Sequence, residues 1–486
     1  MKHMTELKSK AISGVAWSAI ERFSVQIIQF VIGLIIARIL LPSDYGLIAM
    51  VTVFLAIAQC FIDSGFSNAL MQKQNRTAED FSTAFYTNIG VAFVFYAIFY
   101  VCSPLIAEFY NEPSLKVILR ILSLNFVMTS LFLVHRTKMM IEMDFKSMAK
   151  IAIAAAVIGG AIGIYMAIKG FGVWALVAQT MSGSLVSLVV YWIRTKWQPK
   201  LSFSASSFSY LFNFGSKILL AGLIHTIYSN MYSLVIGKKY SSTDLGFYNR
   251  GQSFAYVIPS NLTTIVTQSM YPVLCSLQDD REHLKSAFLS YVRLACFVTF
   301  PIAMLLAALA QPVISIVLTD KWLPATLYLQ IMCFGYMWDP LMRINANSLS
   351  VTGRSDYVLK SETLKKLISV MVLIGSLPFG LNIICIGMAA YSLIDLFISS
   401  IFTKKVVGVS FADEMRAAVP YLVTSILLFG IVFVIDRLIL SDVLSLVCGT
   451  TIGLIFYLLV AFVFKWKELD IVTSTCRNYI LKKRLS

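Results

Sequence analysis

Long runs without charged residues constrain the fold of this chain more than any other feature of its sequence. Examples are residues 81–107, 170–193, 251–278, 294–319, 367–394 and 443–464. Each run is long enough to cross a hydrocarbon core of about 30 Å, which takes about 20 helical residues. Because lipid offers the backbone no hydrogen-bonding partner, such segments must be helices. The sequence therefore predicts an all-α polytopic membrane protein.

Composition supports this class, since hydrophobic residues make up 58% of the chain, charged residues 13%, and the mean hydropathy is +0.78. A soluble domain carries about 25% charged residues. We expect the first apolar segment, which contains Glu21 and Arg22, to remain as a membrane helix, because no small-residue cleavage site follows it. The cysteines, from Cys60 to Cys476, are scattered without CxxC or Cys/His spacing. They predict packing roles, and we expect no metal site and no cofactor.

The hydropathy pattern predicts about fourteen transmembrane helices. They cover residues 14–37, 45–70, 82–107, 114–135, 147–168, 171–193, 212–236, 246–273, 286–311, 324–347, 360–378, 381–402, 417–435 and 442–464. Most of the 40 Lys and Arg residues fall in the termini and in alternate loops. This asymmetry predicts that both termini are cytoplasmic. The net charge of +15 is therefore interpreted as a topology signal, and no nucleic-acid partner is expected.

The chain also contains a weak internal repeat. Residues 37–46 (ARILLPSDYG) align with residues 237–246 (GKKYSSTDLG), and residues 104–112 align less closely with 312–320. The repeat predicts an N-terminal six-helix lobe over residues 1–200 and a second lobe over 201–408. Residues 409–486 would add two helices and a basic cytoplasmic tail. With six helices each, the lobes would be parallel bundles flanking a central cavity, the geometry of alternating access.

Ionisable residues inside membrane helices are costly and by default face a cavity or a partner. Ser18, Arg22, Gln26 and Gln29 form one polar stripe at helical spacing. Buried cations suit an anionic group such as pyrophosphate, because guanidinium groups bind it through paired hydrogen bonds. The candidate pyrophosphate-binding residues are Arg22, Arg250, Arg293, Lys217 and Arg120. The candidate polar lining of the cavity is Ser18, Gln26, Gln29, His225, Asn261 and Gln268.

Several of these residues also have simpler interpretations. Lys217 can extend to the inner headgroups, and His225 can be a buried histidine with its hydrogen bonds satisfied. Glu21 and Asp63 are candidates for ion coupling, although Asp63 can instead cap a helix break. Glu21 is not expected to neutralise Arg22, because adjacent helical residues do not face each other.

Three further acidic positions have local explanations. Asp44 and Asp244 are expected to cap helices. Asp395 is expected to pair with Lys404 or Lys405 near the end of its helix.

Several segments together resemble a known family. They are Ala37–Gly46, Leu245–Gly251 (LGFYNRG), Tyr271–Asp280, and Lys321–Pro324 (KWLP) with Gly353–Asp356 (GRSD). Their order is similar to that of the polysaccharide transport family. These are the Wzx-type flippases of the multidrug/oligosaccharidyl-lipid/polysaccharide superfamily. Together the segments are similar to the colanic acid exporter (WzxC-like) branch.

The resemblance implies fourteen helices in two lobes plus two added helices, in a bacterial inner membrane. It implies translocation of undecaprenyl-pyrophosphate-linked oligosaccharide to the periplasmic leaflet, with arginines of helices 1 and 8 on the pyrophosphate. By position these would be Arg22 and Arg250. Membrane lipids are expected partners, and a polysaccharide polymerase and a chain-length regulator are further possible ones.

Other functions remain open at this point. A multidrug or cation antiporter of the same superfamily would need acidic cavity residues, for which Glu21 is the one favourable feature. A non-transporting scaffold of a polysaccharide assembly complex would tolerate charge changes at Arg22 and Arg250. No Walker loop, GxGxxG or HExxH motif occurs, so we do not expect an enzyme.

Overall fold

The computed structural model describes residues 2–63, 65–471, 473 and 474, and helices are the regular secondary structure of this part of the chain. The predicted basic tail and Cys476 lie largely or wholly outside the described residues. The α-helices are α1 (Lys2–Ile39), α2 (Pro42–Asp63), α3 (Phe66–Gln72), α4 (Ala78–Tyr110), α5 (Leu115–Ile141), α6 (Phe145–Ile168), α7 (Trp174–Thr195), α8 (Ala205–Lys239), α9 (Ser242–Ser276), α10 (Arg281–Ala308), α11 (Ala310–Leu318), α12 (Ala325–Tyr336), α13 (Asp339–Val351), α14 (Ser355–Ser376), α15 (Leu381–Val406), α16 (Phe411–Leu438) and α17 (Asp442–Val463). Short 3₁₀ turns cover Asp320–Trp322 and Leu377–Phe379.

The all-α membrane class is confirmed, and each predicted segment overlaps a helix. Three predicted segments are broken into two helices each, at α2/α3, α10/α11 and α12/α13. Within the described residues, eleven helices are long and apolar enough to span a membrane. The helices α9 and α14 are too polar for this criterion, and α12 and α13 are too short. The number of crossings and the orientation of the termini stay predictions.

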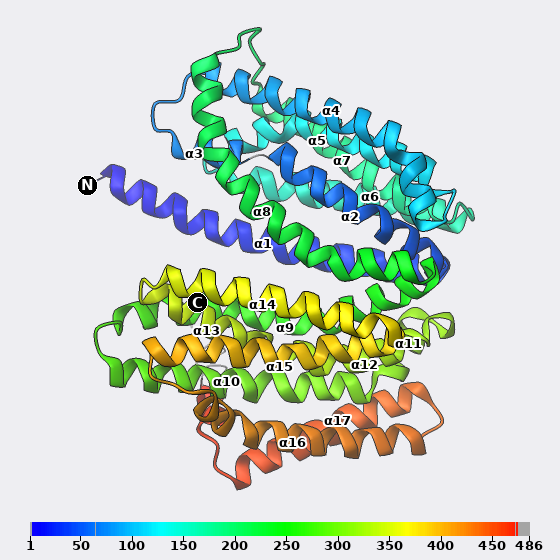
Figure 1. Ribbon diagram of the computed structural model, residues 1–486, viewed down its shortest axis with the longest axis vertical. Helices are drawn as coiled ribbons and strands as arrows, with labels where there is room; N and C mark the ends of the chain where they lie inside the picture. Colours follow the sequence, from blue (N-terminus) through cyan, green and yellow to red (C-terminus); the bar gives the residue numbers. More distant parts are fainter. Residues whose placement is uncertain (1, 64, 472, 475–486) are drawn as a thin grey trace. The chain divides into compact units, whose positions relative to one another are not determined.

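The chain forms two compact units, residues 1–246 and 247–486. In the first unit α4 packs against α5, and α6 packs against both α1 and α7 (Figure 1). Helix α8, which the predicted boundary at residue 200 places in the second lobe, packs against α2, α3 and α4 of this first unit. Its Gly215 lies so close to Gly65 that a Cβ at Gly65 would be 2.9 Å from the Gly215 Cα. The first unit therefore extends through α8.

In the second unit, α10 packs against α12 and α16, and α15 packs against α12, α13 and α14. The helices α16 and α17, drawn in orange and red in Figure 1, pair with each other. Helix α17 also contacts α11, where a Cβ at Gly449 would meet Leu309 at 2.8 Å. Small residues on α17 thus allow close helix packing, as expected where lipid supplies no hydrophobic driving force.

The two segments of the internal repeat have the same local structure. Helix α1 ends at Ile39 and α8 at Lys239, and the next helices begin at Pro42 and Ser242. The Asp44 carboxylate accepts a hydrogen bond from the Leu41 amide at 3.0 Å. The Asp244 carboxylate accepts one from the Ser241 amide at 3.3 Å. The prediction that Asp44 and Asp244 cap helices is confirmed.

The repeated segments also touch each other through their glycines. A Cβ added to Gly46 would overlap the Ser242 carbonyl, and a Cβ added to Gly246 would overlap the Pro42 carbonyl. Gly46 and Gly246 are aligned in the repeat, as are Pro42 and Ser242. The same contact is therefore made twice with the roles exchanged, and each time it requires glycine.

Helix α4 begins with a capping box. The Thr77 hydroxyl accepts from the Asp80 amide at 3.3 Å, and the Asp80 carboxylate accepts from the Thr77 amide at 2.8 Å. Asp80 is fully buried and lies 2.7 Å from the Lys73 ammonium. The Asp80 carboxylate thus accepts a hydrogen bond from the amide at the start of the helix and also pairs with the neighbouring Lys73 ammonium.

We expect Asp80→Ala to lower the free energy of unfolding by about 3 kcal/mol, because it removes the cap and leaves Lys73 without its partner. Thermal unfolding of the purified protein in detergent measures the effect. Glu79→Ala is the matched control, since Glu79 is exposed on the same helical turn. Equal unfolding temperatures for the two variants would show that the cap contributes little.

Candidate functional site

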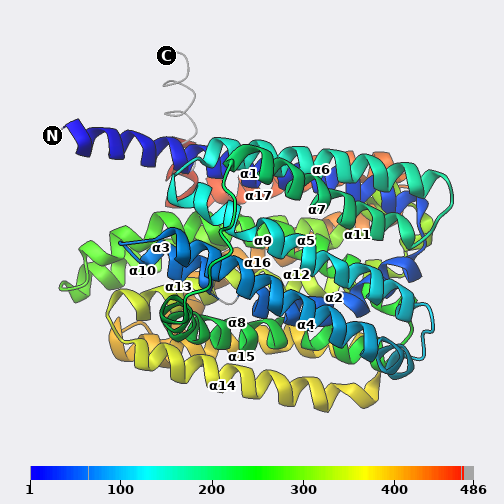
Figure 2. The same ribbon diagram turned by 90° about the horizontal axis from the view of Figure 1, so that it is seen from above.

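The polar stripe of α1 lines one pocket. Ser18, Arg22, Gln26 and Gln29 surround a cavity of about 460 Å³, together with Glu21, Val25 and Ala152. Ala152 comes from α6, which packs along α1, as Figure 2 shows. The spacing of these residues in the sequence therefore places them where a ligand can contact several of them at once.

Glu21, the ion-coupling candidate next to Arg22, belongs to this pocket as well. It lines the same cavity as Arg22, because both long side chains reach it from adjacent positions on α1. Glu21 also interacts electrostatically with Arg136 of α5. The pocket thus contains a carboxylate and a guanidinium group. Arg136 is close enough to Glu21 for its positive charge to attract this carboxylate.

Arg136 lines a second pocket of the first unit, which lies at the break between α2 and α3. This cavity of about 340 Å³ has a polar lining of Asp63, Ser67, Asn68, Arg136 and Thr137. Arg136 interacts electrostatically with Asp63, and the Gln59 amide donates to Asp63 at 3.1 Å. Gly65, with φ of 68°, allows the chain to turn there. Asp63 therefore ends a helix, as predicted, and also faces a pocket.

Sequence reasoning missed Arg136. The hydropathy pattern predicts a helix that ends at residue 135, where the apolar run stops, and places Arg136 in a cytoplasmic loop. In the structure α5 continues to Ile141, so Arg136 lies more than one turn inside the helix. The signal that could have found it is the pair of apolar residues Leu133 and Met140, which are seven positions apart and continue the helical period past Arg136.

Two of the predicted pyrophosphate ligands have local protein partners. The Arg120 guanidinium donates to the Ser103 hydroxyl at 2.8 Å and lies 4.1 Å from the Tyr100 ring centre. Arg293 lies 3.2 Å from the carboxylate of Glu468, which follows α17. These contacts tie helices together, so a role of Arg120 and Arg293 in ligand binding stays a prediction.

The remaining candidates are spread along α8 and α9, and none of them lines the two pockets described above. Lys217 and His225 are exposed on α8, and Gln268 is exposed on α9. The Arg250 guanidinium lies 5.6 Å from the ring centre of the buried Trp322. The Asn261 amide donates to the Val257 carbonyl within α9 at 2.7 Å. Their assignment to a cavity stays a prediction.

Arg354 and Asp356 form an ion pair at the start of α14, before the predicted membrane segment of residues 360–378. Arg354 Nε lies 2.9 Å from Asp356 Oδ1, and this hydrogen bond lowers the pKa of Asp356 to about 2. Among the residues that the structure describes, no three His, Cys, Asp or Glu side chains are grouped to hold a metal ion.

A multi-pass membrane protein with charged pockets along its spanning helices has the architecture of a transporter. Its family follows from the sequence comparison. Residues 35–327 match the family described as "Polysaccharide biosynthesis protein", and the chain belongs to this family.

Curated relatives of this chain are bacterial. It is 24% identical over 465 residues to the teichuronic acid biosynthesis protein TuaB of Bacillus subtilis, covering 94% of this chain and 96% of the relative. It is 25% identical over 413 residues to the lipopolysaccharide biosynthesis protein WzxC of Escherichia coli, covering 83% of each. This confirms the resemblance to the polysaccharide transport family.

Solved structures confirm the fold. The lipid II flippase MurJ in an inward closed conformation matches with a TM-score of 0.75 at 14% identity, over 94% of this chain and all of that chain. An inward-facing multidrug resistance MATE family transporter of the MOP superfamily matches with a TM-score of 0.62 at 13% identity, over 81% of this chain and 98% of that one. The chain therefore has the fold of this superfamily.

Proposed function

We propose that this protein translocates a lipid-linked oligosaccharide, carried on undecaprenyl pyrophosphate, from the cytoplasmic to the periplasmic leaflet of a bacterial inner membrane. The observation that carries the proposal is the charged and polar pocket of α1 within a chain of the polysaccharide biosynthesis family. Relatives named for lipopolysaccharide and teichuronic acid biosynthesis, and the fold shared with a lipid II flippase, support it.

The chemistry of the pocket suits the head of such a substrate. The Arg22 guanidinium offers a planar set of donors that matches phosphate oxygens, and Ser18, Gln26 and Gln29 offer hydrogen bonds to sugar hydroxyls. The polyprenyl tail is apolar and stays in lipid throughout. The protein thus lowers the cost of moving the charged head across the hydrocarbon core, and makes or breaks no covalent bond. A polysaccharide polymerase and a chain-length regulator are the partners that would use the product.

Expression of this protein in a bacterial strain that lacks its own flippase tests the proposal. We expect surface polysaccharide to return and the accumulated lipid-linked precursor to fall, in at least one strain whose repeat unit the protein accepts. Surface polymer and precursor are both quantified, with an empty vector as the control. Failure to restore polymer in every compatible strain, together with resistance to cationic drugs, would instead support the antiporter alternative, for which Glu21 and Asp63 provide acidic residues.

A further inference from the structure

A buried lysine lies between two carboxylates on α14 and α15 of the second unit. Lys365 Nζ is 2.7 Å from Glu362 Oε1 and 3.3 Å from Asp395 Oδ1. The expectation that Asp395 pairs with Lys404 or Lys405 is therefore wrong, because α14 packs beside α15 and brings Lys365 to the acid. Lys365 is buried. A buried ion cluster adds little net stability, so its presence in a membrane protein points to a function.

Further hydrogen bonds fix the position of the cluster. The Tyr391 hydroxyl donates to the Lys365 carbonyl at 2.8 Å and lies 3.4 Å from Asp395 Oδ2. The Ser399 hydroxyl donates to Asp395 Oδ1 at 3.3 Å. Both residues lie on α15 with Asp395. Lys365 and Asp395 are thus held in register by a network that spans the two helices.

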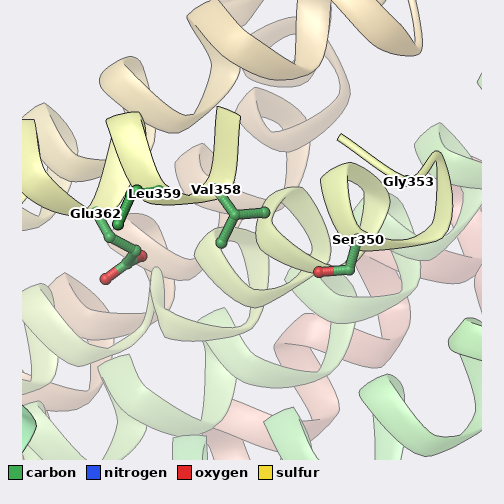
Figure 3. Close-up of a pocket in the computed structure, with 5 residues that line it drawn as sticks. All are labelled: Ser350, Gly353, Val358, Leu359 and Glu362. Carbon is green, nitrogen blue, oxygen red and sulfur yellow. The ribbon is translucent and has the colours of Figure 1, made fainter. Parts of the chain in front are cut away.

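One end of the cluster opens to a pocket. Glu362 lines a cavity of about 380 Å³ with Ser350, Gly353, Val358 and Leu359, at the connection from α13 to α14 (Figure 3). The side chains become less exposed inward, from 42% for Glu362 to 15% for Asp395 and 9% for Lys365. Glu362 is therefore the most accessible carboxylate of the cluster, whereas the Lys365–Asp395 pair is largely shielded.

The elements that pack against α14 and α15 carry few other ionisable groups. They are Asp339 and Arg343 on α13, Tyr328, Cys333 and Tyr336 on α12, and Asp413, Glu414, Arg416, Tyr421, Asp436 and Arg437 on α16. The buried Glu414 carboxylate already accepts hydrogen bonds from Ser400 and Asn345. Asp339 accepts one from Thr263. Lys365 supplies a positive charge in contact with Asp395.

We propose that Glu362, Lys365 and Asp395 form a proton-binding site that couples substrate translocation to a proton gradient, an inference that rests on the proposed function. A hydronium ion gives its proton to Glu362, the most exposed member of the cluster, and is left as water; the proton then passes to the Asp395 carboxylate and forms an O–H bond there. The neutral acid no longer attracts the Lys365 ammonium, which keeps only Glu362 as its partner. The ionic link between α14 and α15 is then lost, and release of the proton restores it.

Translocation by the full-length protein in liposomes tests this coupling. The probe is a fluorescent NBD-labelled undecaprenyl-pyrophosphate monosaccharide, and dithionite quenching reports how much of it faces outward. A gradient of about one pH unit biases a one-proton step by about tenfold, so we expect a shift of that order in the leaflet distribution. Lys365→Met and Asp395→Asn should each abolish the shift but keep binding of the probe. Lys360→Met is the matched control, since Lys360 is exposed on the same helix, and it should respond like the wild type.

The outcomes separate this proposal from the proposed function. The coupling site is overturned if wild-type translocation does not respond to the gradient. It is also overturned if folded Lys365→Met and Asp395→Asn still respond to it. Either result leaves the flippase assignment intact. A wild-type protein that neither binds nor moves the probe overturns both. Lys365→Arg retains the positive charge and should recover part of the response, which distinguishes a coupling role from a purely structural one.

Discussion

Arg22→Ala should reduce polysaccharide export and cause lipid-linked precursor to accumulate. Arg22 lines the α1 pocket beside Ser18 and Gln26. Hydrogen bonds to a charged group contribute about 1.5–3 kcal/mol, so losing them should weaken binding of the pyrophosphate roughly ten- to a hundredfold. Binding of undecaprenyl pyrophosphate to the purified protein measures this directly, and rescue of a flippase-deficient strain measures its effect on export.

Comparison variants make the test specific. Arg22→Lys keeps the charge without the planar donor set and should lie between wild type and Arg22→Ala. Arg194→Ala, at the exposed end of α7, is the control for removing one positive charge from the first unit. Normal binding and export by well-expressed Arg22→Ala would make Arg22 structural. In that case Arg136→Ala, which alters the second pocket and the interaction with Glu21, becomes the decisive variant.

Gly46→Ala and Gly246→Ala should each destabilise the protein by about 3 kcal/mol or more. In both cases the added Cβ would overlap a backbone carbonyl, of Ser242 or of Pro42. A backbone carbonyl at the start of a helix cannot rotate away as a side chain can, so the helices must separate. The unfolding temperature in detergent and the amount of protein in the membrane should both fall.

Gly90→Ala is the matched control for these substitutions. Gly90 lies within α4, and no atom would lie within 4 Å of a Cβ at this position. Alanine is the better helix former, so this variant should be as stable as the wild type or more stable by up to about 1 kcal/mol. If Gly46→Ala unfolds at the same temperature as Gly90→Ala, the contact between the repeated segments is looser than the structure indicates.

The sequence predicted the helices well because uncharged runs in a membrane protein have one stable backbone structure. It did not predict the break at Leu309, since residues 294–319 form one uncharged run and the break depends on tertiary packing. The break before Asp339 likewise falls inside a predicted segment. Hydropathy locates an apolar segment, but it does not show where the helix within that segment is interrupted.

The α1 pocket was partly predictable because its residues lie on one helix at regular spacing. Contacts between helices were not, since they depend on how each helix is rotated about its axis. The sequence therefore did not predict that Lys365 pairs with Asp395, or that Arg136 interacts with Glu21. Arg120, chosen for its charge alone, contacts Ser103 instead.

The reciprocal contact of Gly46 and Gly246 suggests an origin for the chain. Residues 42–46 meet residues 242–246 through equivalent positions, which is the pattern of an isologous interface in a two-fold dimer. A half-length ancestor that paired with its own copy through this surface would need no new contact after gene duplication and fusion. Fusion would then release each copy to diverge, so that one could keep the Glu21 pocket and the other the Lys365 cluster.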